Sequence, residues 1–238
     1  MMKTSTMMRA MVLMFGLGAA CLPARAATQL VDDFNRTDNN TVGNGWTESE
    51  SGAGASAIRV GSNALQLYYA GTSVAGREFV YRDVSSLYQT TFNSAGATLE
   101  WVFNMRQGRT SPSGYAANTY GAAFILGCTA INPQAGTGNG YAVIIGESGS
   151  ADTIRLVRFA GGLNADADWT GIIAQSPAAT LTDYYSIKVT FNPSNGQWEL
   201  LTRSDGASAF ADPTAGTALT SRGTATDTTY TGSDLRYL

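Results

Sequence analysis

The sequence contains no histidine, and this absence excludes several kinds of catalytic and metal-binding site. Serine and cysteine nucleophiles that need an imidazole base are excluded, as are metal sites built on imidazole ligands. An enzyme built from this chain would therefore have to use carboxylates. Charged residues make up only 14% of the chain, so the polar surface must come mainly from Thr, Ser, Asn and Gly.

Cysteine is also scarce, with only Cys21 and Cys128 present. Cys21 belongs to the N-terminal segment Met1–Ala26, which has the features of a secretory signal peptide: basic residues, the apolar run Ala10–Leu22 and a small-residue ending. The run is shorter than the roughly 20 residues of a membrane-spanning helix. We therefore predict export to the periplasm, cell surface or medium, without a transmembrane span in the mature chain. A lipoprotein anchored at Cys21 is the alternative.

Removing these 26 residues from 238 leaves 212, a length that suits one domain over residues 27–238. The removed segment carries three basic and no acidic residues, so the remainder has 12 basic and 18 acidic residues and a net charge of −6. Such a chain does not suit a polyanion, and we expect no nucleic-acid partner. Cys128 is left without a disulfide partner; because it ends an apolar run, we predict an inert buried thiol.

The segment Tyr184–Arg203 gives the clearest structural signal. Every second residue from Tyr185 to Phe191 is apolar, which predicts a strand with one buried face. The turn residues 193–196 follow, with Asn-Gly expected to supply positive φ angles, and Trp198 and Leu200 continue the pattern. A lone hairpin is not stable, so we predict a layered all-β domain.

Further strands are expected wherever apolar residues alternate or form short runs between turn residues. Two of these segments, Tyr120–Cys128 and Gly140–Glu147, are apolar almost throughout, which predicts burial on both faces of a sheet. Because no segment shows capped helical periodicity, the prediction is an all-β, two-sheet antiparallel sandwich or jelly roll. The remaining predicted strands are Gln29–Phe34, Ala57–Val60, Ala64–Tyr69, Glu78–Val84, Ala97–Met105, Thr153–Phe159 and Ile172–Ala174.

Three segments have the composition of surface loops: Gln107–Thr119, Gly161–Thr170 and Asp205–Asp227. The first is long enough to be a functional loop. The C-terminal segment Thr228–Leu238 ends without a closing turn, and this pattern predicts a domain truncated at its C-terminus.

Several stretches together carry a family resemblance: Val31–Arg36 followed by Gly43–Trp46, Gly140–Val143 with Ile154–Arg158, and the hairpin Tyr185–Trp198. The chain resembles concanavalin A-like, laminin G-like domains of bacterial secreted proteins. The resemblance implies a jelly roll whose first and last strands lie side by side. It also implies polysaccharide as the most plausible ligand and, in many such domains, a bound calcium ion.

Glucanases of this fold carry two carboxylates at alternate positions of one strand, and glycoside hydrolysis needs them roughly 5 to 9.5 Å apart. Glu48 and Glu50 alternate, but in a Ser- and Gly-rich segment. We therefore assign no catalytic residue, and a carboxylate-dependent glycan hydrolase or lyase, assembled by long-range pairing, stays an alternative. The other glutamates considered, each expected on a solvated strand face, are Glu78, Glu100, Glu147 and Glu199.

Structural calcium is the cofactor that the resemblance and the oxygen ligands suggest. Asn164, Asp166 and Asp168 have the spacing of a calcium loop, although Trp169 stands where such a loop needs glycine, so an ordinary polar turn is the alternative. Asp32 and Asp33 are further candidates beside the first predicted strand. The metal ligands themselves remain unassigned.

Aromatic residues in polar loops are the candidates for sugar binding, because aromatic faces pack on sugar rings. Tyr115 and Trp169 satisfy this condition, whereas Trp46, Trp101 and Trp198 are expected in the core. The sequence thus predicts a secreted, non-catalytic binding or adhesion module that recognises a polysaccharide or cell-surface glycan. A structural domain of a larger cell-surface protein is a further alternative.

Overall fold

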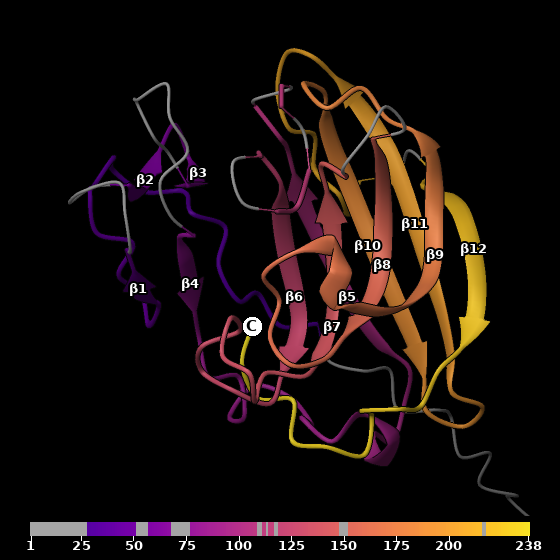
Figure 1. Cartoon of the computed structure of the whole chain (residues 1–238). Helices are drawn as coiled ribbons and strands as arrows, with labels where there is room; N and C mark the ends of the chain where they lie inside the picture. Colours follow the sequence, from indigo (N-terminus) through magenta and orange to yellow (C-terminus); the bar gives the residue numbers. More distant parts are fainter. Residues whose placement is uncertain are drawn as a thin grey trace, which may run out of the picture.

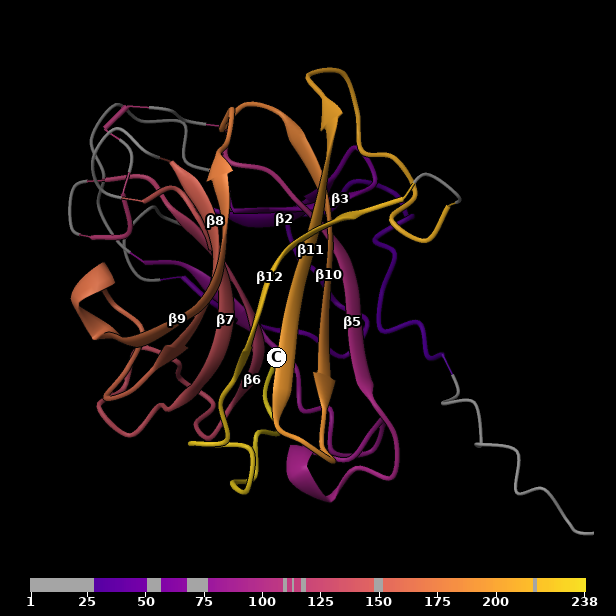
Figure 2. The same ribbon diagram turned by 90° about the vertical axis from the view of Figure 1, so that its right-hand side faces the viewer.

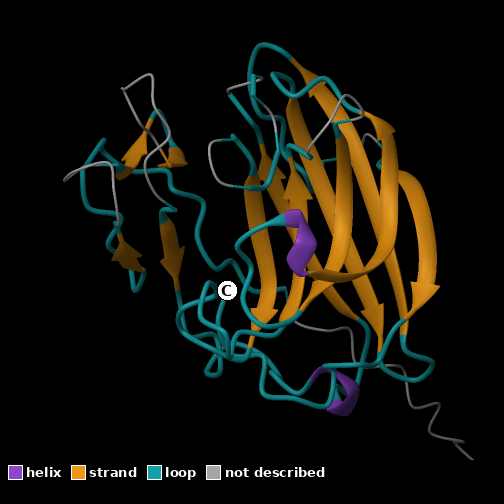
Figure 3. Ribbon diagram, viewed as in Figure 1, coloured by secondary structure: helices purple, strands orange, loops and turns teal. Residues whose placement is uncertain are grey.

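The computed structural model describes residues 28–50, 57–67, 77–108, 111–112, 114–116, 119–147, 152–215 and 218–238. Within these ranges the fold is built almost entirely of strands, with two single-turn 3₁₀ helices, η1 (Phe92–Ser94) and η2 (Asp166–Asp168) (Figure 3). Two four-stranded antiparallel sheets form a sandwich, and two smaller two-stranded sheets stand beside it (Figure 1). The predicted all-β sandwich is therefore confirmed.

The first sheet has the order β12-β11-β10-β5 and is centred on the predicted hairpin. The alternation that predicted it is confirmed, because Ile187, Val189 and Phe191 are fully buried. The turn between β10 and β11 places only Gly196 at positive φ (+68°), so the expectation that Asn195 would share this conformation was wrong. The strands are β5 (Leu99–Met105), β10 (Tyr184–Asn192), β11 (Gln197–Gly206) and β12 (Thr220–Thr226).

The second sheet has the order β6-β7-β8-β9 and is covered on both faces. All six residues of β7 are buried, as their continuous apolar pattern predicted. A second, smaller cluster centred on Ala142, Val157 and Phe159 covers the face turned away from the first sheet. The strands are β6 (Ala122–Cys128), β7 (Gly140–Ile145), β8 (Thr153–Phe159) and β9 (Trp169–Ala178).

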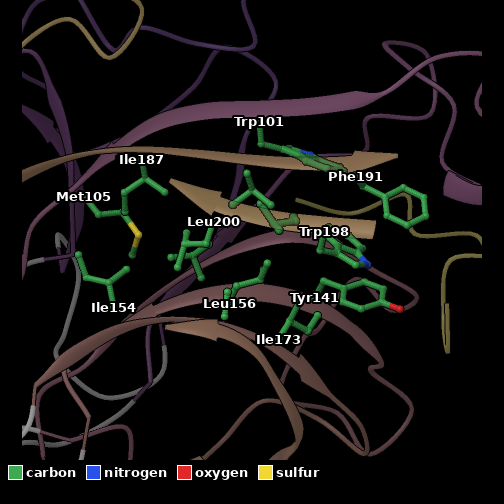
Figure 4. Close-up of a cluster of buried hydrophobic side chains, with 14 of the residues drawn as sticks. Trp101, Met105, Tyr141, Ile154, Leu156, Ile173, Ile187, Phe191, Trp198 and Leu200 are labelled. Carbon is green, nitrogen blue, oxygen red and sulfur yellow. The ribbon is translucent and has the colours of Figure 1, made fainter. Parts of the chain in front are cut away.

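The main core lies between the two sheets. Trp101, Trp198 and Leu200 from the first sheet meet Tyr141 and Leu156 from the second (Figure 4). The rings of Trp101 and Trp198 are stacked with centroids 5.9 Å apart, and Tyr141 lies 4.5 Å from Trp198. This contact between aromatic rings of opposing sheets holds the two layers together.

The two small sheets belong to the N-terminal part of the chain. They pair β1 (Thr47–Ser49) with β4 (Phe79–Tyr81) and β2 (Ile58–Gly61) with β3 (Ala64–Leu67). Their own cluster is centred on Val42, Ile58 and Val60. At the C-terminus, Tyr237 bridges Asp83 and Cys128, so residues 235–238 lie between the β4 segment and β6. The predicted burial of Cys128 is confirmed at 1% exposure.

The predicted opening strand Gln29–Phe34 was wrong, because the structure has no strand there and Leu30 is 72% exposed. The Asp32 carboxylate accepts a hydrogen bond of 2.8 Å from the Phe34 N–H, and Phe34 adopts a positive φ of 52°. A side chain that captures a nearby backbone donor competes with strand pairing. The apolar alternation alone did not reveal this competition.

Two other predictions need correction. Asp205–Asp227 is not entirely loop, because β12 lies within it and pairs with β11. The edge strand expected at Ile172–Ala174 is longer and begins at Trp169.

The predicted signal peptide lies outside the described residues, as do parts of the predicted strand Ala64–Tyr69 and of the loop Gln107–Thr119. Among the described residues, no helix has the length and apolar character needed to cross a membrane.

Candidate functional site

Tyr115 and Trp169, far apart in sequence, lie together on the outer face of the second sheet. Their ring centroids are 6.4 Å apart, and both rings pack partly buried against the second cluster. The loop before β9 is tied to the Tyr115 segment, because the Asp166 N–H donates to the Tyr115 carbonyl at 2.9 Å. Burial raises the pKa of the Tyr115 phenol above its ordinary value, because it penalises the charged form. Trp169 is the first residue of β9 rather than a loop residue.

Polar groups from the second sheet flank Trp169. The Arg155 guanidinium lies 5.5 Å from the centroid of the Trp169 ring and forms an ion pair with Glu147. Thr153 links this pair, accepting from Arg155 Nε and donating to Glu147 Oε2, both at 2.9 Å. Such mutual bonds hold the guanidinium in a fixed orientation beside the ring.

The tryptophans expected in the core are found there or near it. Trp198 is fully buried and Trp101 is 7% exposed, which confirms both predictions. Trp46 is partly buried and packs against the N-terminal cluster, with its ring 5.9 Å from that of Phe34. Trp101 and Trp198 therefore offer no free ring face to a ligand.

The predicted calcium loop is held by internal hydrogen bonds. Asp168 Oδ2 accepts from the backbone N–H groups of Asn164 and Ala165 at 2.7 and 2.9 Å. The Asn164 side-chain oxygen accepts from Arg77 at 3.0 Å. Two of the three predicted ligands therefore have oxygen atoms engaged by protein donors. In the part of the chain that the structure describes, no three acidic or cysteine side chains are grouped to hold a metal ion.

Asp32 organises the N-terminal loop. Its side chain is 2% exposed and accepts hydrogen bonds from Arg36 at 2.7 Å, from Asn44 at 3.0 Å and from Trp46 Nε1 at 2.9 Å. Burial would raise the pKa of Asp32, but these donors outweigh it and the pKa is lowered. The loop borders an open hollow of about 560 Å³ lined by polar residues that include Asp33 and Asn35.

The carboxylates of the first sheet share its outer face. Strand register places Glu100 and Glu199 on either side of Thr190 in one row. Two strand spacings separate their backbones by about 9.6 Å. Lys188 forms an ion pair of 2.7 Å with Glu100, whose side chain is 51% exposed. This face is open to solvent at Glu100 and at Val102, which is 37% exposed.

Sequence reasoning missed a second group of aromatic residues, at the end of the first sheet. Phe210 lies in the segment between β11 and β12, is 38% exposed, and contacts Tyr184 with ring centroids 4.5 Å apart. Arg106 lies over the Tyr184 ring at 4.4 Å. The same signal that identified Tyr115, a lone aromatic in a polar loop, was present at Phe210.

Comparison of the chain with protein-family models, with curated proteins and with solved structures found no match.

Proposed function

We propose that this chain is an exported, non-catalytic binding module that recognises a polysaccharide through the surface around Tyr115 and Trp169. The observation that carries the proposal is the meeting of these two rings, 6.4 Å apart, on the outer face of the second sheet. Sugar-binding sites combine aromatic surfaces with a few well-placed polar groups. The resemblance to concanavalin A-like, laminin G-like domains implies the same ligand class.

The groups around Trp169 suit a ligand rich in hydroxyl groups. Arg155 and Glu147 supply charged donors and acceptors beside the ring, and their mutual ion pair fixes their positions. The Trp169 indole Nε1 is buried and has no hydrogen-bond partner among the described residues.

A glycan array of the purified protein tests this proposal, with Trp169→Ala as the decisive variant and Phe79→Ala as the control. Phe79 is a partly buried aromatic of the N-terminal sheets, so its loss should leave glycan binding unchanged. We expect the parent and Phe79→Ala to bind the same glycans, and Trp169→Ala to bind them at least about tenfold more weakly. Equal binding by Trp169→Ala and the parent would remove Trp169 from the site.

A further inference from the structure

The aromatic group at the end of the first sheet is held in place by a network of hydrogen bonds. Ala211, the residue after Phe210, is bonded through both backbone groups: its N–H donates to Asp205 at 3.2 Å, and its carbonyl accepts from Asn104 at 3.1 Å. The Asp205 side chain is itself only 1% exposed and is paired with Arg203 at 2.7 Å. The Phe210 segment, at the upper right in Figure 2, is thus anchored to β5 and β11 at its centre.

Tyr184 links Phe210 to a positive charge. The Phe210 and Tyr184 rings meet at an interplanar angle of 86°, an arrangement that aromatic pairs favour. Arg106 lies over the Tyr184 ring and donates to its hydroxyl and to the Thr182 carbonyl, both at 2.9 Å. The exposed guanidinium therefore has a fixed position next to exposed aromatic surface.

Among the described residues, Arg106 has no carboxylate partner. Arg36, Arg155 and Arg158 each form an ion pair, whereas no described carboxylate lies within 4.0 Å of Arg106. Asp183 lies between Thr182 and Tyr184, the two residues that Arg106 contacts, and its carboxylate accepts from Ser204 at 2.9 Å. A fixed, exposed guanidinium without a counter-charge is suited to bidentate binding of a carboxylate or sulfate.

We propose that Phe210, Tyr184 and Arg106 form a second saccharide site, specific for acidic sugars. Phe210 packs on the face of a sugar ring, and Arg106 binds the carboxylate or sulfate that the ring carries. The site lies on a different sheet from Trp169 and uses different residues, so it goes beyond the function proposed above. Each site can therefore be inactivated while the other is left intact.

Titration calorimetry with tetragalacturonate, a sulfated galactan tetrasaccharide and the neutral galactose tetrasaccharide tests the second site. We expect the parent to bind at least one acidic probe at least about tenfold more tightly than the neutral one. Phe210→Leu should lose this binding, because leucine retains apolar bulk without a ring face, and Phe210→Tyr should keep it. Arg106→Gln should bind acidic and neutral probes equally. The two acidic probes identify which anion is preferred.

Three outcomes would overturn the second site: no binding of either acidic probe, equal binding by Phe210→Leu and the parent, or a retained acidic preference in Arg106→Gln. The Phe210 and Arg106 side chains are both exposed, so their variants should remain folded, and thermal unfolding of each variant checks this. Trp169→Ala should keep its affinity for the acidic probe. If neutral glycans bind through Trp169 while the acidic probes fail, the second site alone is wrong.

Discussion

Val189→Asp tests the assignment of buried and exposed faces on which the sandwich rests. Val189 is fully buried on β10, opposite Trp101 on β5 and Leu200 on β11. Its replacement loses about 1.5–3 kcal/mol of side-chain burial. Burying a carboxyl group without a hydrogen-bond partner lowers the stability by about a further 1–3 kcal/mol even when it is neutral, and by more when it is ionised. The total of about 2.5–6 kcal/mol compares with a typical stability of about 5–15 kcal/mol.

The matched control is Val102→Asp, the same substitution on the neighbouring strand β5. Val102 is 37% exposed and lies opposite Lys188, so its stability change should stay within about 0.5 kcal/mol. Urea unfolding measures both variants, with the midpoint reporting stability if the slope is unchanged. A Val189→Asp midpoint equal to that of the parent, or a larger loss for Val102→Asp, would show that the two faces are inverted.

Three further predictions concern packing, pH and metal binding. Gly140→Ala should lower the free energy of unfolding by about 1–3 kcal/mol or more, because the new Cβ would lie 2.0 Å from the Gly127 carbonyl oxygen. The control Gly136→Ala places its Cβ in open space and should leave the melting temperature unchanged. The pKa of Asp32 is lowered in the folded protein, so its contribution to stability is present above the unfolded pKa of about 3.9 and is lost as pH falls through the folded value. Asp32→Asn should therefore melt at a lower temperature than the parent at pH 7. On acidification, the variant should lose less stability than the parent does. If calcium is bound, EDTA should lower the melting temperature, and an unchanged melting temperature would exclude a structural calcium ion.

The hairpin and the buried strands could be predicted from sequence because their signals are local. Alternation along β10 reports which side chains face the core, whatever the partner strand is. β12 has no such signal: its small polar residues form a strand because β11 offers backbone partners. The segment at Asp32 looked like a strand because alternation does not show that a carboxylate will capture a nearby backbone N–H.

The candidate sites were only partly predictable for the same reason. The composition of their surroundings identified Tyr115 and Trp169 individually, but their contact depends on how the Tyr115 segment and η2, which precedes β9, pack on the outer face of the second sheet. Predicting the site at Phe210 would have required contacts between residues still farther apart in the sequence. Its segment is anchored by Asp205 and Asn104, which lie on different strands, and its aromatic neighbour Tyr184 begins a third.

Affinity electrophoresis in gels containing neutral or acidic polysaccharides tests saccharide binding most directly. The parent should migrate more slowly in at least one gel than in the polysaccharide-free gel. The double variant Trp169→Ala with Phe210→Leu should migrate alike in all gels. A parent protein whose migration no polysaccharide changes, or a double variant retarded as strongly as the parent, would contradict the account.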